Sequence, residues 1–204
     1  MNGTLAPVRI LPILEIQAAP VRLAARLAPC AYGKSVPREL VMQPHGEGVV
    51  RLFTTDGASM VVIDAPGHCA APVALGTREV MQLLQRHSDA ELFTVSPAAE
   101  GDWSWRVRTY SPSMTCAMEL QRGQGIEADA IARVVGMGDG DTGGTGGTWS
   151  VMALKPLAKL LMDSKGERID RVEMATVGTD GPLRVTFAMG ECSGKLVVMR
   201  CGEK

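Results

Sequence analysis

The sequence lacks a long apolar run, a strong net charge and any closely spaced pair of cysteines, and each absence excludes a class of protein. No stretch of about 18 apolar residues occurs, so we expect no membrane-spanning helix. The apolar patch near the N-terminus has no basic region before it and is interrupted by Pro12, which argues against a signal peptide. The formal net charge of −1 provides no global positive field, so any DNA-binding charge must be local.

The cysteine pattern indicates a reducing compartment. The five cysteines are odd in number and scattered, and no CxxC pair is present: Cys30, Cys69, Cys116, Cys192 and Cys201. Free cysteines of this kind serve as small buried hydrophobic residues in cytoplasmic proteins. We therefore expect a cytoplasmic protein without disulfides or a metal site.

Catalytic motifs are also missing. His45, His68 and His87 are isolated in the sequence, and no serine or cysteine lies in a recognisable nucleophile context. The glycine-rich stretch 136–148 lacks the GKS or GKT of a phosphate-binding loop and the ligand spacing of a calcium loop. We expect no catalytic residues, no cofactor and no metal, and an enzyme is the least favoured class.

The most informative stretch is 49–65, VVRLFTTDGASMVVIDA, in which two apolar segments flank Asp56-Gly57. This dipeptide tolerates positive φ and is typical of tight turns between antiparallel strands. The pattern predicts a β-hairpin. Further strands are predicted at 13–17, 40–43, 72–75, 91–96, 103–110, 114–121, 149–152, 170–177, 183–189 and 195–200.

Three helical patterns interrupt the strands, beginning near Pro20, Thr77 and Leu154. Proline is favourable in a first helical turn, and Thr77 is a suitable N-cap. Each helix is followed by several strands, so the sequence predicts a repeat of about fifty residues. The predicted fold class is α+β, with repeated β-α-β-β-β units whose helices cover one face of antiparallel sheets.

Each predicted helix also carries basic residues on the side turned away from its apolar face. These residues are Arg22, Arg26, Arg78, Arg86, Lys155 and Lys159. For a single helix, a solvated surface is an equally good interpretation. Three repeats of the same pattern in a chain of net charge −1 favour a locally basic surface.

Four segments together resemble a known family. Residues 52–60, LFTTDGASM, resemble the signature ATDGHRLA, and residues 72–84 resemble VPAKALKEL. Residues 126–135 resemble the connecting segment FPDYRRVIP, and residues 181–201 resemble an ending with the strand pattern P-(L/V)-x-(V/I) followed by VVMPMR. In order and spacing these segments resemble the DNA polymerase sliding clamps, most closely the bacterial β clamp.

The resemblance implies a division of the chain: a lead-in at 1–13, a complete clamp-like domain at 14–122, a connecting segment with a Gly-rich linker at 123–147, and half a domain at 148–204. Bacterial clamps have three complete domains per chain and eukaryotic clamps two, so this chain is short for the family. A phage or mobile element would suit such a short clamp, by size alone.

The resemblance also implies a function without chemistry. The basic helices would contact DNA phosphates without reading bases, in a ring of several copies that encircles duplex DNA. Polymerase or other replication proteins would dock in an apolar pocket formed, by match, by Thr55, Gly57, Met60, Val134, Val197 and Met199. Core packing is an equally weighted interpretation of Met60 and Val197. The alternative function is a clamp-fold accessory or adaptor protein that binds polymerase or clamp partners without encircling DNA.

Overall fold

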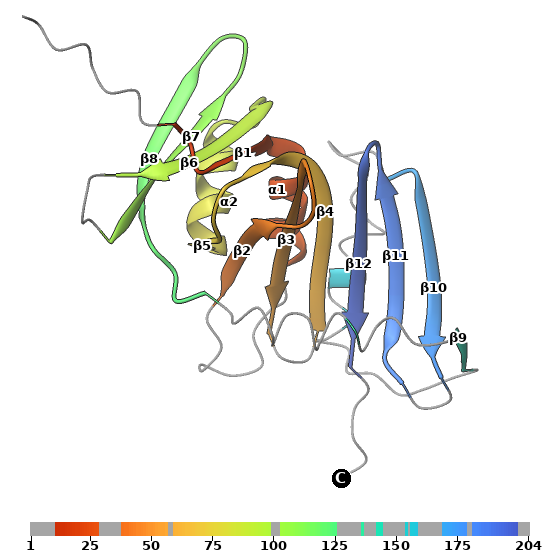
Figure 1. Ribbon diagram of the computed structural model, residues 1–204. Coiled ribbons are helices and arrows are strands. Elements are labelled where there is room, and N and C mark those ends of the chain that lie inside the picture. The colour runs from red at the N-terminus through yellow and green to blue at the C-terminus, as the bar shows by residue number, and fades with distance from the viewer. Residues whose placement is uncertain are drawn as a thin grey trace, which may run out of the picture.

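The structure is a computed structural model that describes residues 11–28, 38–56, 59–98, 103–125, 136, 142–144, 154, 156–158, 169–178 and 181–199. The described elements are two helices and twelve strands (Figure 1). In chain order they are β1 (Leu14–Gln17), α1 (Ala18–Leu27), β2 (Glu39–Pro44), β3 (Val49–Thr55), β4 (Ser59–Cys69), β5 (Val73–Gly76), α2 (Thr77–Arg86), β6 (Leu92–Pro97), β7 (Ser104–Tyr110), β8 (Thr115–Gln121), β9 (Thr142–Gly144), β10 (Arg171–Val177), β11 (Leu183–Met189) and β12 (Cys192–Val198).

The element order confirms the predicted repeat for its first two copies. The succession β1-α1-β2-β3-β4 is followed by β5-α2-β6-β7-β8, which is the same β-α-β-β-β unit used twice. The first strand of each unit pairs with the other unit: β1 pairs with β6 as well as with β4 of its own unit, and β5 pairs with β2. Every pairing among the described strands is antiparallel. These pairings join the sheets of the two units.

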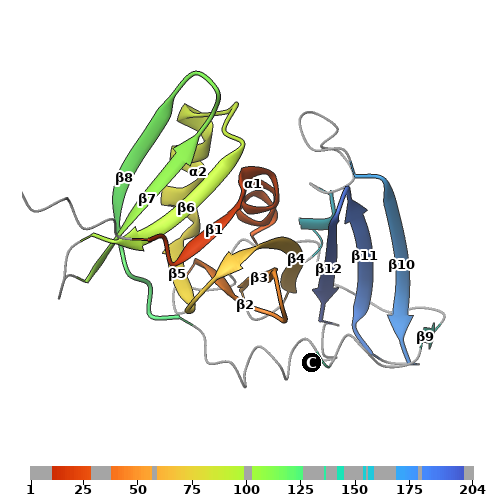
Figure 2. The ribbon, with the colours of Figure 1, turned by 45° about the horizontal axis from the view of Figure 1, so that its top comes forward.

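Strand β4 joins these two units to the C-terminal strands. Its residues 60–66 pair with β3, and its residues 67–69 pair with β1. On its other edge, residues 59–64 pair with β12, so the sheet continues from β4 through β12, β11 and β10 to β9 (Figures 1 and 2). The result is a continuous path of strands from β8 at one edge to β9 at the other.

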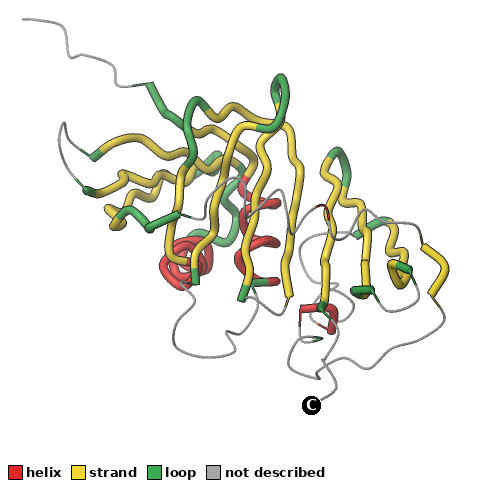
Figure 3. The backbone as a smooth tube through the Cα atoms, turned by 60° about the horizontal axis from the view of Figure 1, so that its bottom comes forward, coloured by secondary structure: helices red, strands yellow, loops and turns green. Residues whose placement is uncertain are grey.

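The two helices pack side by side on one face of the sheet (Figure 3). Helix α1 buries Val21, Ala24 and Leu27, the residues that the 3.6-residue period places on one side. Helix α2 buries Val80, Leu83 and Leu84 in the same way. Val61 and Ile63 of β4 enter this main core, whereas Met60 and Val62 face the opposite side because side chains alternate along a strand.

Several boundaries differ from the predictions. Alternation along the predicted strand 103–110 would place Trp103 and Trp105 on the same face, but Trp103 precedes β7 and is 83% exposed while Trp105 is 7% exposed. Thr77 is the first residue of α2 rather than its cap. Its hydroxyl donates to the carbonyl of Arg38 instead of accepting from its own helix, and the chain enters α2 through Gly76 without a side-chain cap.

The C-terminal region shows two further differences. Strand β9 lies inside the stretch 136–148, which composition alone predicted to be a loop. Strand β12 begins at Cys192 rather than at 195, because Met189 pairs with Cys192 and the hairpin turn is only Gly190-Glu191. Gly190 has φ +56°, a conformation that favours glycine. The predicted strand 149–152 and most of the third predicted helix lie outside the described residues; within that helix, residues 156–158 are helical.

Candidate functional site

The basic residues of α2 are exposed on the outer side of the helix. Arg78 and Arg86 lie on its solvent face, opposite the buried Val80, Leu83 and Leu84. No described acidic residue forms an ion pair with either guanidinium within 4.0 Å. Both side chains are therefore able to contact a large anionic surface that approaches the helix face.

The two arginines of α1 are more enclosed. Arg22 is half-buried, and its guanidinium donates to the carbonyls of Ser88 and Ala90 at 3.0 and 3.2 Å. It thereby ties α1 to the turn that follows α2, and part of its donor capacity serves the fold. Arg26 lies half-buried in the last turn of α1, where a positive charge complements the helix dipole.

The helix pair thus carries arginines on two neighbouring elements, exposed on α2 and half-buried on α1. Lys155 and Lys159, the predicted basic residues of the third helix, lie outside the described residues. The described part of the chain therefore contains four of the six predicted DNA-facing residues, on two helices that contact each other. Among these four, only Arg78 and Arg86 are exposed.

The opposite face of the sheet carries a second apolar cluster, built where β12 meets β4. Val197 is the register partner of Met60, and Met60 is also the register partner of Thr55 in β3. Met199 packs against the edge of this cluster. Four of the predicted pocket residues are thus brought together, whereas Gly57 and Val134 lie outside the described residues.

Burial shows how this cluster is built. Met60 and Val197 are each only 1% exposed, so both are packed residues in this structure. Sequence reasoning missed the remaining members, which come from neighbouring strands: Val41, Phe53, Val62 and Ala74. The alternation in residues 49–65 could have identified Phe53 and Val62, because both lie on the Met60 face. We call these residues, with Met60 and Val197, the outer apolar cluster.

The turn beside the cluster explains the local sequence TTDG. Asp56 is 3% exposed, and its Oδ1 accepts the backbone N–H of Ser59 at 2.8 Å. The backbone N–H of Asp56 donates to the carbonyl of Ser59 at 3.2 Å. An aspartate that accepts from the backbone in this way stabilises a tight turn, which fixes the register of β3 against β4.

The described cysteines and acidic residues form no recognisable reactive centre. Cys69, Cys116 and Cys192 carry free thiols. Burial raises the pKa of Cys69 and of Cys192, and the charge of Glu191 adds to the effect at Cys192. Within the described ranges, no three His, Cys, Asp or Glu side chains are grouped to hold a metal, and no helix is long and apolar enough to cross a membrane.

Comparison with known proteins gives structural matches alone. No family model and no curated protein matches the sequence. The DNA polymerase sliding clamp from Bacillus subtilis superimposes with a TM-score of 0.60 at 8% identity, over 99% of this chain and 67% of that one. Proliferating Cellular Nuclear Antigen from Entamoeba histolytica gives a TM-score of 0.57 at 13% identity, over 94% of this chain and 100% of that one.

A third match is the PCNA of A. fulgidus, solved with the C-terminal region of FEN-1 bound to it, with a TM-score of 0.54 at 11% identity over 94% of this chain and 100% of that one. At these identities the likeness shows the fold. The matched architecture is the mostly antiparallel sheet with paired helices on one face that the chain itself displays. This chain has the sliding-clamp fold.

Proposed function

We propose that the chain is a processivity factor in DNA replication, which encircles duplex DNA as a homo-oligomer and tethers polymerase or other replication proteins in the cytoplasm. The observation that carries the proposal is the separation of two surfaces by one sheet. Arginines line the helix face, and the outer apolar cluster lies on the opposite face. A protein that slides on DNA while holding a partner needs two such surfaces.

The helix face supplies a contact of the right kind for sliding. Arg78 and Arg86 are exposed on long side chains, so their guanidinium groups can reach the phosphates of a duplex that lies along α2. Arginine–phosphate contacts are independent of sequence and weaken with salt, so the protein can move along the duplex. Lys155 and Lys159 would extend this surface, and Arg22 and Arg26 would add to it from α1.

The border of the outer apolar cluster, where Thr55 and Met199 are only partly buried, is the proposed docking place for partner peptides. Gly57 and Val134 would complete it. The A. fulgidus PCNA, with the C-terminal region of FEN-1 bound to it, supports the idea that a protein of this fold can hold a segment of a partner. Holding a polymerase in this way raises its effective concentration at the template.

Retention on closed circular DNA tests the proposal. A ring stays on a nicked circle in moderate salt and leaves when the circle is linearised, because enclosure rather than affinity holds it. Light scattering over a concentration series should show a closed oligomer. A stable monomer that leaves circles and linear DNA equally fast would contradict encirclement and favour the non-encircling accessory or adaptor protein.

The arginines can be tested separately by salt dependence. Replacing Arg78 or Arg86 by glutamine should lower the slope of log K against log salt by about 1 for each phosphate that the variant no longer neutralises. Arg171→Gln is the matched control, because Arg171 is 75% exposed on β10 in a different part of the sheet. Equal slopes for all three variants would remove α2 from the DNA-contacting surface.

A further inference from the structure

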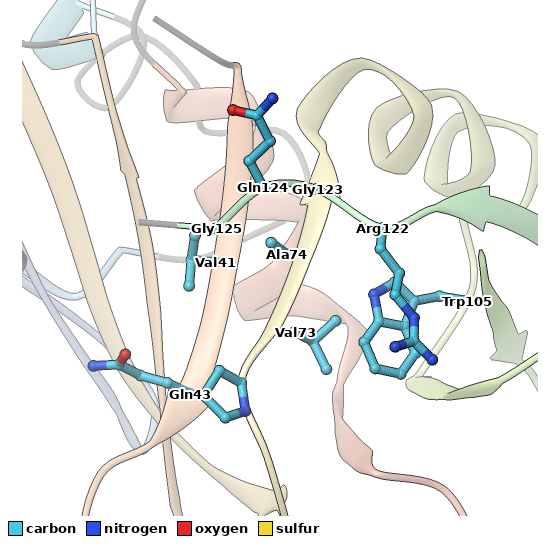
Figure 4. A pocket seen from close by; sticks show the side chains of 10 residues that line it. Val41, Gln43, Val73, Ala74, Trp105, Arg122, Gly123, Gln124 and Gly125 are labelled. Atoms are coloured by element: carbon cyan, nitrogen blue, oxygen red, sulfur yellow. The ribbon is translucent and has the colours of Figure 1, made fainter. Parts of the chain in front are cut away.

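A cavity of about 420 Å³ lies beside the outer apolar cluster, between β2 and β5 on one side and the ends of β7 and β8 on the other (Figure 4). Val41 and Ala74 belong both to the cluster and to the cavity wall. The cavity is therefore continuous with the proposed docking place for partner peptides.

One wall of the cavity is held in place by backbone hydrogen bonds, two of them to the buried side chain of Glu39. The backbone N–H of Gly123 donates to the carbonyl of Ala74 at 3.0 Å. Glu39, only 8% exposed, accepts the backbone N–H groups of Gln124 and Gly125 at 2.8 and 3.0 Å. The segment after β8 is thus held against β5 and β2, so the cavity is formed before any ligand arrives.

Trp105 contributes an unsatisfied donor. Its side chain is 7% exposed, and its Nε1 is buried with no acceptor among the described residues. In Figure 4 this nitrogen is on the side of the ring that faces Val73 and Ala74 across the cavity. A buried N–H without a partner is costly, and an acceptor placed in the cavity would satisfy it.

Arg122 is a charged side chain that lines the cavity, whereas the Glu39 carboxylate behind the wall already accepts two backbone N–H groups. The guanidinium carbon of Arg122 lies 4.2 Å from the centroid of the Trp105 ring, a cation–π contact. The side chain makes no ion pair with any described residue, and it is the one ionisable group among the described residues that line the cavity. The wall therefore offers indole and guanidinium donors and a positive charge next to the apolar side chains of Val41, Val73 and Ala74.

We propose that this cavity binds an aspartate or glutamate side chain of the partner peptide whose apolar residues dock on the outer apolar cluster. The ligand carboxylate pairs with Arg122 and accepts the indole N–H of Trp105, while the peptide continues over Val41 and Ala74 toward Met199. A carboxylate satisfies both groups at once, because it is an acceptor with a negative charge. The inference rests on the proposed function, since it adds an acid-binding position to the same partner site.

Selection of short random peptides displayed on phage, against the full-length protein, provides the probe. We expect the selected peptides to be enriched in aspartate or glutamate. Trp105→Phe keeps an aromatic ring and removes the N–H, and it should weaken binding of a selected peptide about tenfold. Arg122→Gln should weaken binding to a similar extent, and the weakening should shrink when the acidic residue of the peptide is replaced by its amide.

Matched controls are available on the same sheet. Trp103→Phe changes a tryptophan that is 83% exposed, and Arg108→Gln removes a positive charge from β7; neither should alter binding. The indole N–H resonance of Trp105, assigned from the Phe variant, should move downfield when the acidic peptide is added. If one variant proves unstable in a thermal melt, the other and this resonance still decide the question.

The outcomes separate this inference from the function on which it rests. Peptides that bind Met199→Ala weakly, but bind Trp105→Phe and Arg122→Gln as tightly as the wild type, would overturn the acid-binding cavity and leave the partner site standing. Selection of no peptide, or of peptides without acidic residues, would also overturn it. Retention on circular DNA is measured without any peptide, so it tests encirclement independently of the acid-binding cavity.

Discussion

Replacing Gly194 by alanine is the sharpest test of how β12 is seated in the sheet. Gly194 pairs with Phe187 of β11, whose ring lies over the glycine and is only 5% exposed. A Cβ built on Gly194 would lie 2.8 Å from Cε1 of that ring and closer still to Cζ and Cε2. The ring must therefore move, which should cost about 1 to 3 kcal/mol, as for other overpacked sites.

The sign of the stability change caused by Gly194→Ala is as informative as its size. In a strand with free space, Gly→Ala stabilises by about 0.5 to 1 kcal/mol, because alanine loses less backbone entropy on folding. Urea unfolding followed by tryptophan fluorescence should instead show a lower midpoint with an unchanged m-value. Ser193→Ala, an exposed neighbour on the same strand, should change stability by less than about 0.5 kcal/mol.

A double variant identifies the cause. Phe187→Leu should destabilise the protein alone, but it shortens the side chain that the new methyl group at position 194 would strike. The destabilisation of the double variant should therefore be smaller than the sum of the two single effects by about 1 kcal/mol. If Gly194→Ala is as stable as the wild type or more stable, the ring does not cover Gly194 and the β11–β12 register described above is wrong.

Three further outcomes follow from the buried contacts. Asp56→Ala removes the acceptor for the Ser59 N–H and should lower the free energy of unfolding by about 1 to 2 kcal/mol in chemical denaturation; an unchanged midpoint would contradict that role. Glu39→Gln weakens the acceptor for the backbone N–H groups of Gln124 and Gly125. Hydrogen exchange at these two groups should therefore become faster, while exchange in β3 should not change. Because burial and the charge of Glu191 raise the pKa of Cys192, less thiolate is present at neutral pH. The rate of alkylation of Cys192, mapped by mass spectrometry, should be lower than in urea-unfolded protein. This rate should still increase with pH at values above the usual thiol pKa.

The repeat and its hairpin could be predicted from the sequence because their signals are local. The apolar segments on both sides of Asp56-Gly57 predict the two strands that pair as β3 and β4, and the 3.6-residue period predicts which helix residues are buried. Strand β9 could not be predicted, since Thr142–Gly144 has little β-propensity of its own and its pairing with β10 comes from tertiary context.

The candidate sites were predictable only in part. Arg78 and Arg86 lie on the outer helix face as their spacing indicates, but nothing in the sequence reveals that Arg22 donates to carbonyls 66 and 68 residues away. Trp105 and Arg122 meet only after β7 and β8 have paired, so their contact has no sequence signature. Such long-range arrangements depend on register, which local patterns do not specify.

The place of β4 between β3 and β12 has a consequence for the covalent chain. Residues 59–64 of β4 pair with β12, and this ladder also buries Met60 against Val197. A peptide bond cut within residues 126–141 would leave these contacts untouched, so the N-terminal and C-terminal fragments should remain associated and co-elute. The connection between them is then dispensable for holding the halves together, and two separately expressed fragments should reconstitute the fold by complementation.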